Sequence, residues 1–211
     1  MTYSQNTYGR TIDGMFKKME MFEAITKNIA NANSVAYKRR IPESVNFKSV
    51  LGDMARDNSQ GQLKETQKAF DLAIEGDAFF MVEAKTGITT TRNGRFELNK
   101  EGDLVTLEGE KVVIVEKSEN PLNLRDHTNI EIDDQGIISI DGERYGRIAL
   151  SIQNNKPVRV HQGYIETSNV NIINEMSSLT MAFRSIEASE KVLGMEASVD
   201  KELVEKYGRN V

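Results

Sequence analysis

The sequence predicts an α+β protein, in which long N- and C-terminal helices pair as a coiled coil and a central domain is mostly antiparallel β-sheet. Two observations predict the helices, because apolar residues recur at heptad spacing near each end of the chain. A third predicts the sheet, because the apolar period changes to two in the middle. We therefore expect a discontinuous helical coiled-coil domain from residues 1–36 and 166–211, a connector over 37–70 and a β-rich outer domain over 71–165.

The C-terminal helix is predicted over residues 168–207, which contain no proline. Its apolar residues follow one another at steps of four and three: Ile172, Met176, Leu179, Phe183, Ile186 and, beyond the polar Glu190, Leu193. Ser168 or Asn169 can cap its start. A helix of about 36 residues is on the order of 50 Å long. It cannot bury its own apolar seam, so it needs a partner helix.

The N-terminal helix is predicted over residues 5–31 and is the candidate partner. Its heptad positions carry Ile12, Met15, Met19, Phe22 and Ile29, with Thr26 at the remaining position. Asn28, Asn31 and Asn33 indicate the helix end, because asparagine tolerates the left-handed conformation of a C-cap. The basic run that follows, residues 38–40, is interpreted as a solvated cluster beyond a helix C-terminus.

Between the helices, residues 43–70 indicate a connector with one short helix, and residues 71–165 indicate eight or nine short antiparallel strands. Ala78–Val82 is an apolar run typical of a buried strand. Asn93-Gly94 predicts a type I′ hairpin between residues 87–92 and 95–98. Further hairpins are predicted around residues 108–110, 133–136 and 154–155.

The composition indicates a soluble globular protein, with 211 residues of which 38% are hydrophobic and 28% charged. Its net charge of −5 argues against nucleic acid as the main partner, because phosphate binding needs a concentrated basic face. The absence of cysteine excludes disulfides and thiolate metal sites. We find no apolar run that could span a membrane and no apolar core of a cleavable secretory signal, which taken alone indicates the cytoplasm.

No catalytic, cofactor or metal site is predicted, and we do not expect an enzyme. The two histidines, His127 and His161, have no partners at metal-ligand spacing. Asp133-Asp134-Gln135-Gly136 lacks the rest of a calcium loop and is interpreted as a polar turn. The motifs that bind phosphates or dinucleotides, or that present a nucleophilic serine, are missing. From the residues alone, a soluble β-rich binding module with a helical stalk is an open alternative.

Three segments carry a more specific signal: an asparagine-rich helix end, a group of central strands and the start of the C-terminal helix. Their marked residues are Asn28, Asn31, Asn33, Tyr37, Lys38, Gly76, Phe79, Phe80, Thr91, Arg92, Gly94, Phe96, Ser168, Asn169, Val170 and Arg184. Together the segments resemble the bacterial flagellar basal-body rod protein family, the rod and hook axial proteins. The amino-acid sequence of residues 163–171 resembles that of the distal-rod subunit most.

The resemblance implies a structural subunit of the rod, which polymerises helically into the hollow axial drive shaft that carries torque and conducts exported subunits. It implies further copies of the chain, other rod and hook subunits and the flagellar type III export apparatus as partners, with no nucleic acid and no direct membrane insertion. It implies a place in the flagellum basal body, periplasmic or in the cell envelope, reached without a cleavable signal. The two heptad seams would pair as a coiled coil on assembly.

The chain departs from the family pattern at a few positions. Lys27 stands where asparagine is usual, and Ala36 and Ala78 stand where glycine is usual. The outer domain is short, so a proximal position in the rod is also open. A hook or hook-junction subunit of the same family is the alternative, although hook proteins usually have a larger outer domain.

Overall fold

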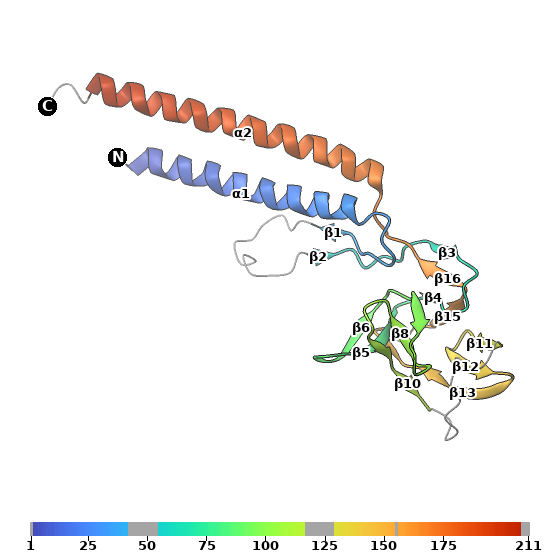
Figure 1. The fold of residues 1–211 in the computed structure, drawn as a ribbon. Helices are drawn as coiled ribbons and strands as arrows, with labels where there is room; N and C mark the ends of the chain where they lie inside the picture. The colour runs from blue at the N-terminus through green and yellow to red at the C-terminus, as the bar shows by residue number, and fades with distance from the viewer. Residues whose placement is uncertain (1, 42–54, 117–128, 155, 208–211) are drawn as a thin grey trace. The chain divides into compact units, whose positions relative to one another are not determined.

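A computed structural model describes residues 2–41, 55–116, 129–154 and 156–207 (Figure 1). The chain divides into two compact units, each built from separate stretches of sequence. The helical unit contains the described residues of 1–32, 39–57 and 170–211, and the β unit contains those of 33–38 and 58–169. Much of the expected connector, residues 42–54, lies outside the described residues.

The helical unit consists of two helices and a short two-stranded ribbon. Its elements are α1 (Thr2–Ala30), β1 (Arg40–Ile41), β2 (Ala55–Arg56) and α2 (Ile172–Tyr207), and α1 and α2 lie side by side (Figure 1). The N-cap of α2 is Asn171, whose side-chain Oδ1 accepts a hydrogen bond of 3.1 Å from the backbone N–H of Asn174. The predicted caps, Ser168 and Asn169, lie before the helix. Neither described helix combines the length and apolarity that crossing a bilayer requires.

The predicted α+β fold class, with two helices paired as a long coiled coil, is wrong. The described chain has one N-terminal helix, one C-terminal helix and a set of β-sheets formed by the residues between them, and the two helices form no long coiled coil. The predicted heptad residues do not form a buried seam. Five of them are exposed and the others are half-buried: Ile12, Met19, Ile172, Met176 and Phe183 in the first group, and Met15, Phe22, Ile29, Leu179, Ile186 and Leu193 in the second.

The physical reason lies in the residues that the helices bury instead. In α1 these are Ala24, Ile25 and Asn28, and in α2 they are Glu175, Ala182 and Ser189. Most of them are small or polar, so a search for large apolar residues passes over them. Small side chains let two backbones approach closely, and the larger apolar side chains beside them then stay accessible to solvent.

The β unit contains all the remaining strands, which are more numerous and shorter than predicted. They are β3 (Leu63–Glu65), β4 (Leu72–Glu75), β5 (Ala78–Ala84), β6 (Gly87–Thr91), β7 (Phe96–Leu98), β8 (Leu104–Thr106), β9 (Lys111–Val112), β10 (Ile114–Val115), β11 (Ile130–Ile132), β12 (Ile137–Ile140), β13 (Glu143–Ile148), β14 (Leu150–Ile152), β15 (Arg159–Gln162) and β16 (Tyr164–Glu166).

All strand pairs of the β unit are antiparallel. A six-stranded sheet has the order β14-β5-β9-β8-β7, with β6 also paired to β5, and a four-stranded sheet has the order β10-β13-β12-β11. Three pairings, one of them within the six-stranded sheet, join distant parts of the sequence and are nested within one another. β3 pairs with β16, β4 with β15 and β5 with β14.

Two of the predicted hairpins are confirmed and two are wrong. β8 pairs with β9 around residues 108–110, and β11 pairs with β12 around residues 133–136. In the second turn, the carboxylate of Asp133 accepts the backbone N–H groups of Gln135 and Ile137. Asn93-Gly94 forms no hairpin between its flanking strands, because β6 pairs with β5 and β7 with β8. Likewise, the strands on either side of residues 154–155 pair with β5 and β4.

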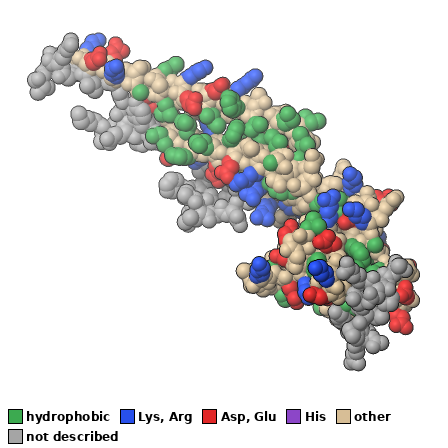
Figure 2. Space-filling model, in the orientation of Figure 1, with side chains coloured by type: hydrophobic (Ala, Val, Ile, Leu, Met, Phe, Trp, Pro, Cys, Tyr) green, Lys and Arg blue, Asp and Glu red, His purple; other side chains and the backbone are tan. Residues whose placement is uncertain are grey.

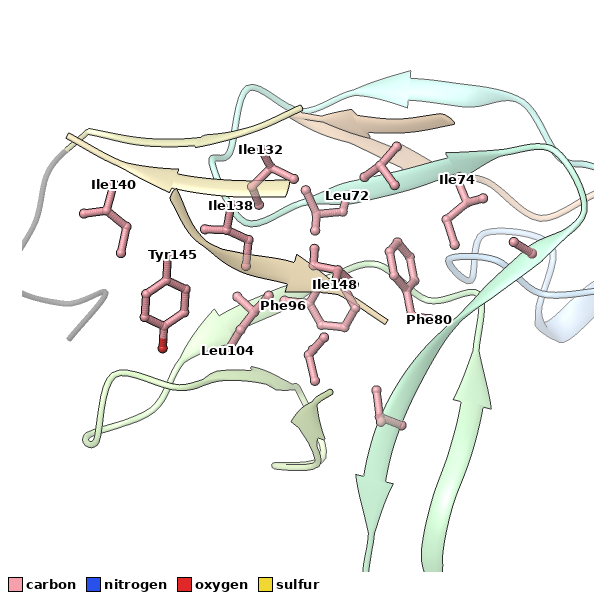
Figure 3. Close-up of a cluster of buried hydrophobic side chains, with 14 residues drawn as sticks. Leu72, Ile74, Phe80, Phe96, Leu104, Ile132, Ile138, Ile140, Tyr145 and Ile148 are labelled. Carbon is pink, nitrogen blue, oxygen red and sulfur yellow. The ribbon is translucent and has the colours of Figure 1, made fainter. Parts of the chain in front are cut away.

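The hydrophobic core of the β unit lies among its sheets (Figure 3). Its buried side chains come from both large sheets and from the paired strands β4 and β15: Leu72, Ile74, Ala78, Phe80, Val82, Phe96, Leu104, Val112, Ile132, Ile138, Ile140, Tyr145, Ile148 and Val160. The rings of Phe80 and Phe96 meet edge to face, with centroids 5.1 Å apart. This core gives the β unit its own source of stability.

Candidate functional site

A buried carboxylate of the β unit belongs to Glu166, at the end of β16, which is only 1% exposed. Its Oε1 accepts a hydrogen bond from Lys38 Nζ at 2.6 Å and another from the backbone N–H of Gly61 at 2.9 Å. Its Oε2 accepts one from Arg92 Nε at 2.8 Å. A buried carboxylate is tolerated only when it is paired and hydrogen-bonded, and Glu166 meets both conditions.

Arg92 ties this carboxylate to the strands of the six-stranded sheet. Its guanidinium donates to the backbone carbonyls of Gly76 and Ala78, and it lies over the Phe79 ring, 5.6 Å from the ring centroid. The planar guanidinium offers several fixed donors, so one side chain can satisfy a carboxylate and two carbonyls together. Gly76, Phe79 and Arg92, which the resemblance singled out separately, therefore meet in one place.

A second set of hydrogen bonds joins Lys38, Ser59 and Asn169. The backbone carbonyl of Ser59 accepts Lys38 Nζ at 2.8 Å and Asn169 Nδ2 at 3.0 Å. The backbone N–H of Asn169 donates to the carbonyl of Tyr37 at 3.3 Å. Three stretches that lie far apart in the sequence are thus held together at this edge of the β unit.

A matching cluster in the helical unit surrounds Glu175, in the first turn of α2. Its Oε1 accepts Arg39 Nε at 2.5 Å, and its Oε2 accepts Asn28 Nδ2 at 3.2 Å. The Asn28 carboxamide also bonds both backbone groups of Arg40, which fixes the chain after α1. Asn28 and Glu175 are both buried, so this cluster joins the end of α1 to the start of α2 inside the unit.

The expected solvated basic cluster at residues 38–40 is therefore wrong in its first two members. Lys38 and Arg39 carry ion pairs to carboxylates that are almost completely buried. Sequence reasoning also passed over Glu166 and Glu175 as site residues. A partial signal was present, because three consecutive cations follow the predicted N-terminal helix, Glu166 precedes the predicted C-terminal helix and Glu175 lies in its first turns.

Further along the helices, α1 and α2 touch through a polar bridge and an aromatic pair. Lys18 Nζ donates to the carbonyl of Ser185 at 3.2 Å and to Ser189 Oγ at 2.6 Å. The rings of Phe22 and Phe183 lie 6.4 Å apart between centroids. We call the following apolar residues, which the heptad pattern marked on the two helices, the apolar stripe: Ile12, Met15, Met19, Phe22, Ile172, Met176 and Phe183.

The apolar stripe is accessible to solvent over much of its length. Met176 is 57% exposed and Phe183 is 56% exposed. Hydrophobic side chains gather on the helical unit in the view of Figure 2. Isolated exposed apolar residues are ordinary on protein surfaces, but many of them on two helices that lie side by side make a candidate surface for another molecule to cover.

Several residues that the resemblance marks take no part in these clusters. Arg184 is exposed on α2, and Phe80 and Phe96 belong to the core. Thr91 Oγ1 accepts the backbone N–H of Asn93, and Asn31 Nδ2 caps the carbonyl of Lys27. Asn33 is exposed, while Ser168 and Val170 are half-buried in the segment that leads to α2.

The described residues offer little that resembles a reaction centre. No group of three or more His, Asp or Glu side chains within them could hold a metal ion. His161 bonds Glu75 Oε2 at 2.9 Å across β15 and β4, and His127 lies outside the described residues. A groove of about 640 Å³ in the β unit is lined by apolar residues with Gln135, Arg147 and Lys156, and no carboxylate or histidine lines it.

The fold and the two carboxylate clusters together define a class of protein. It has a β unit, and a helical unit in which the N-terminal and C-terminal helices together carry an accessible apolar stripe. Known families match both parts. The family described as the flagellar hook protein FlgE/F/G D1 domain matches residues 73–140, and the flagellar basal body rod FlgEFG protein C-terminal family matches residues 161–205. The chain belongs to the flagellar rod and hook protein family.

Individual relatives carry the names of three members of this family. The flagellar basal-body rod protein FlgF of Mesorhizobium japonicum is 29% identical over 88% of this chain and 91% of its own length. The flagellar basal-body rod protein FlgG of Buchnera aphidicola is 31% identical over 64% of each chain. The flagellar hook protein FlgE of Brucella abortus is 36% identical over 46% of this chain and 28% of its own.

Proposed function

We propose that the chain is a structural subunit of the flagellar basal-body rod, which polymerises helically into the hollow axial shaft. Family membership makes it a structural rod or hook subunit. The observation that carries the narrower proposal is the apolar stripe, which exposes large side chains on the unit that contains both helices. In a polymer, neighbouring subunits would remove this stripe from water, and its burial would stabilise the assembly.

The extent of each match supports a rod subunit over a hook subunit. The chain aligns with 91% of the FlgF relative but with only 28% of the hook protein relative. The FlgG relative is intermediate, at 64%. We therefore propose a FlgF-like rod subunit, whose β unit carries the short outer domain that the sequence predicted.

Partners and location follow from the same proposal. We expect contacts with further copies of the chain, with other rod and hook subunits and, during delivery, with the flagellar type III export apparatus. The basal body is the location that the names of the relatives support, and we propose a periplasmic position within it. Since the family is a structural one, we assign no catalytic step to the chain.

The substitution Phe183→Asp tests this proposal. Phe183 is exposed and its ring contacts that of Phe22 of α1, so a charge at this position should leave the β unit folded while making the apolar stripe costly to bury in a polymer. We expect the β unit of the purified monomer to stay folded by circular dichroism, rods in isolated basal bodies to stop before this subunit, and motility to be lost. Electron microscopy of basal bodies and a swimming assay provide the readout.

Ile88→Asp is the matched control. Ile88 is a large apolar residue of similar exposure, but it lies on β6 in the β unit. This variant should assemble as the wild type does. That result would show that an added carboxylate does not block assembly at every exposed apolar position. Full-length rods built from the Phe183→Asp chain would count against the role of the stripe.

A further inference from the structure

We propose that Lys38 and Arg39 form a split anchor, in which two consecutive cations bind buried carboxylates of different units. Residue 38 is the last residue of one segment of the β unit, and residue 39 is the first residue of a segment of the helical unit. The split anchor would fix the point at which the chain passes from one unit into the other. This inference concerns the chain itself and does not depend on the proposed assembly.

On the side of the β unit, Lys38 is held by two partners. Its Nζ lies 2.6 Å from Glu166 Oε1 and 2.8 Å from the carbonyl oxygen of Ser59. Ser59 and Asn169 lie next to the other points where the chain leaves this unit, and Asn169 Nδ2 bonds the same Ser59 carbonyl. Lys38 therefore takes part in a hydrogen-bonded group that includes residues beside three of the boundaries between the units, after residue 38, before residue 58 and after residue 169, and it also binds a buried carboxylate.

On the side of the helical unit, Arg39 has the corresponding role. Its Nε lies 2.5 Å from Glu175 Oε1, and its carbonyl accepts the backbone N–H of Asp57 at 2.8 Å. Arg39 and Asp57 are the two ends of the segment that this unit contributes between the helices. Both ends of the segment are thus tied to each other and, through Glu175, to the start of α2.

The burial of the two carboxylates makes each contact specific. Glu166 and Glu175 are both almost completely buried, so neither can turn to water when Lys38 or Arg39 is removed. Glu166 would then keep Arg92 as its remaining cation, but its Oε1 would lose Lys38. Lys38 and Arg39 bind different carboxylates. Loss of Lys38 should therefore loosen the backbone only in the β unit, and loss of Arg39 only in the helical unit. In a solvated basic cluster, removal of either cation would not affect the two units differently.

The test compares Lys38→Met with Arg39→Met in the full chain, by amide hydrogen exchange. Methionine keeps an unbranched, mostly apolar side chain and removes the charge. Lys38→Met should speed exchange about tenfold at the amides of Gly61 and Asn169, which bond Glu166 and Tyr37. Arg39→Met should do the same at the amides of Arg40 and Asp57. Each variant should leave the reporter amides of the other set unchanged.

Matched controls remove exposed cations that also carry ion pairs. Lys111→Met breaks the pair with Asp103 in the β unit, and Lys27→Met breaks the pair with Glu23 in the helical unit. Neither should change either reporter set, because solvent can replace an exposed partner. The buried core amides of Leu72 and Ile138 serve as a reference for global unfolding.

The proposal is overturned if either methionine variant speeds both reporter sets equally, or speeds neither. A Glu175→Gln chain gives an independent measurement should a methionine variant fail to fold. It should speed exchange at Arg40 and Asp57 and leave Gly61 unchanged, and faster exchange at Gly61 would refute the division between the units. Arg39→Lys keeps the charge and should restore part of the protection that Arg39→Met loses.

Discussion

At the scale of single residues, Gly94 is a glycine whose structural role differs from the hairpin turn that its sequence context predicted. Asn93-Gly94 has the composition of a type I′ turn, and the sequence offers no other use for the glycine. In the structure, a Cβ at position 94 would lie 1.7 Å from the carbonyl oxygen of Leu72. Glycine is needed here because a neighbouring strand passes against the backbone, and the Leu72 N–H donates to the Gly94 carbonyl at 2.8 Å.

Gly94→Ala is therefore expected to destabilise the β unit by about 2 kcal/mol or more, because backbone atoms must move to admit the methyl group. Urea unfolding followed by circular dichroism measures the loss. Gly194→Ala is the counterpart, since an added Cβ meets nothing within 4 Å and alanine favours a helix by up to about 1 kcal/mol over glycine. Equal stability of wild type and Gly94→Ala would contradict the steric account.

Ala36 shows a second limit of reading residues singly. The resemblance places glycine at this position, and the structure gives Ala36 a positive φ of 55°, a conformation that glycine adopts without strain. Its backbone N–H donates to the Glu166 carbonyl at 2.8 Å, which holds the turn in place. The hydrogen bond joins residues 130 positions apart, so the amino acid at position 36 does not by itself reveal the partner of its backbone.

At the scale of elements, the helices were predictable in existence and approximate bounds, but their packing was not. The 3.6-residue period of apolar residues identified α1 and α2 within a few residues of their ends. The same period did not reveal which stripe is buried, because Ala182 and Ser189 lie beside larger residues such as Phe183. Large side chains dominate a pattern search, whereas close helix contact selects small ones.

Charge pairs on helix surfaces belong to this scale as well, and α1 carries one between Glu23 and Lys27. The hydrogen bond and charge of Lys27 lower the pKa of the Glu23 carboxyl below its ordinary value. A lowered carboxyl pKa means that the pair stabilises the folded state at neutral pH, and that this contribution is lost as the pH falls through the folded-state pKa. The contribution is small because both side chains are exposed.

Lys27→Met is expected to raise the Glu23 pKa toward its ordinary value, since it removes the main cause of the shift. An NMR titration of the Glu23 side-chain carboxyl measures this directly. Lys17→Met, another exposed lysine of α1, should leave the Glu23 pKa where it is in the wild type. A Glu23 pKa that does not respond to Lys27→Met would contradict the assignment.

At the scale of the whole molecule, the two units differ in where their stability comes from. The β unit has a contiguous core with many fully buried side chains, including Phe80 and Ile138. The helical unit buries mainly small and polar residues and leaves its large apolar side chains accessible. The change in the period of apolar residues separated the helical regions from the β-rich region. It could not show which distant strands pair, because pairings such as β4 with β15 leave no local signal in the sequence.

Hydrogen exchange on the dilute monomer and on assembled rods should reveal this difference. We expect core amides of the β unit to exchange slowest in the monomer, and amides of α1 and α2 to exchange much faster. In assembled rods, the helical amides should slow by on the order of a hundredfold, because neighbours cover the apolar stripe. Helical amides that are already as protected as the β core in the dilute monomer would argue for a self-contained helix pair.

The nested strand pairs have a consequence for the order in which the chain can fold. β3, β4 and β5 leave the ribosome first, yet their partners β16, β15 and β14 are made much later and in reverse order. Closing such long loops is slow, and none of these three pairings can form until the later partner strand has been synthesised. The growing chain therefore lacks these three pairings until late in synthesis, and the β unit cannot complete its fold before β16 has been made.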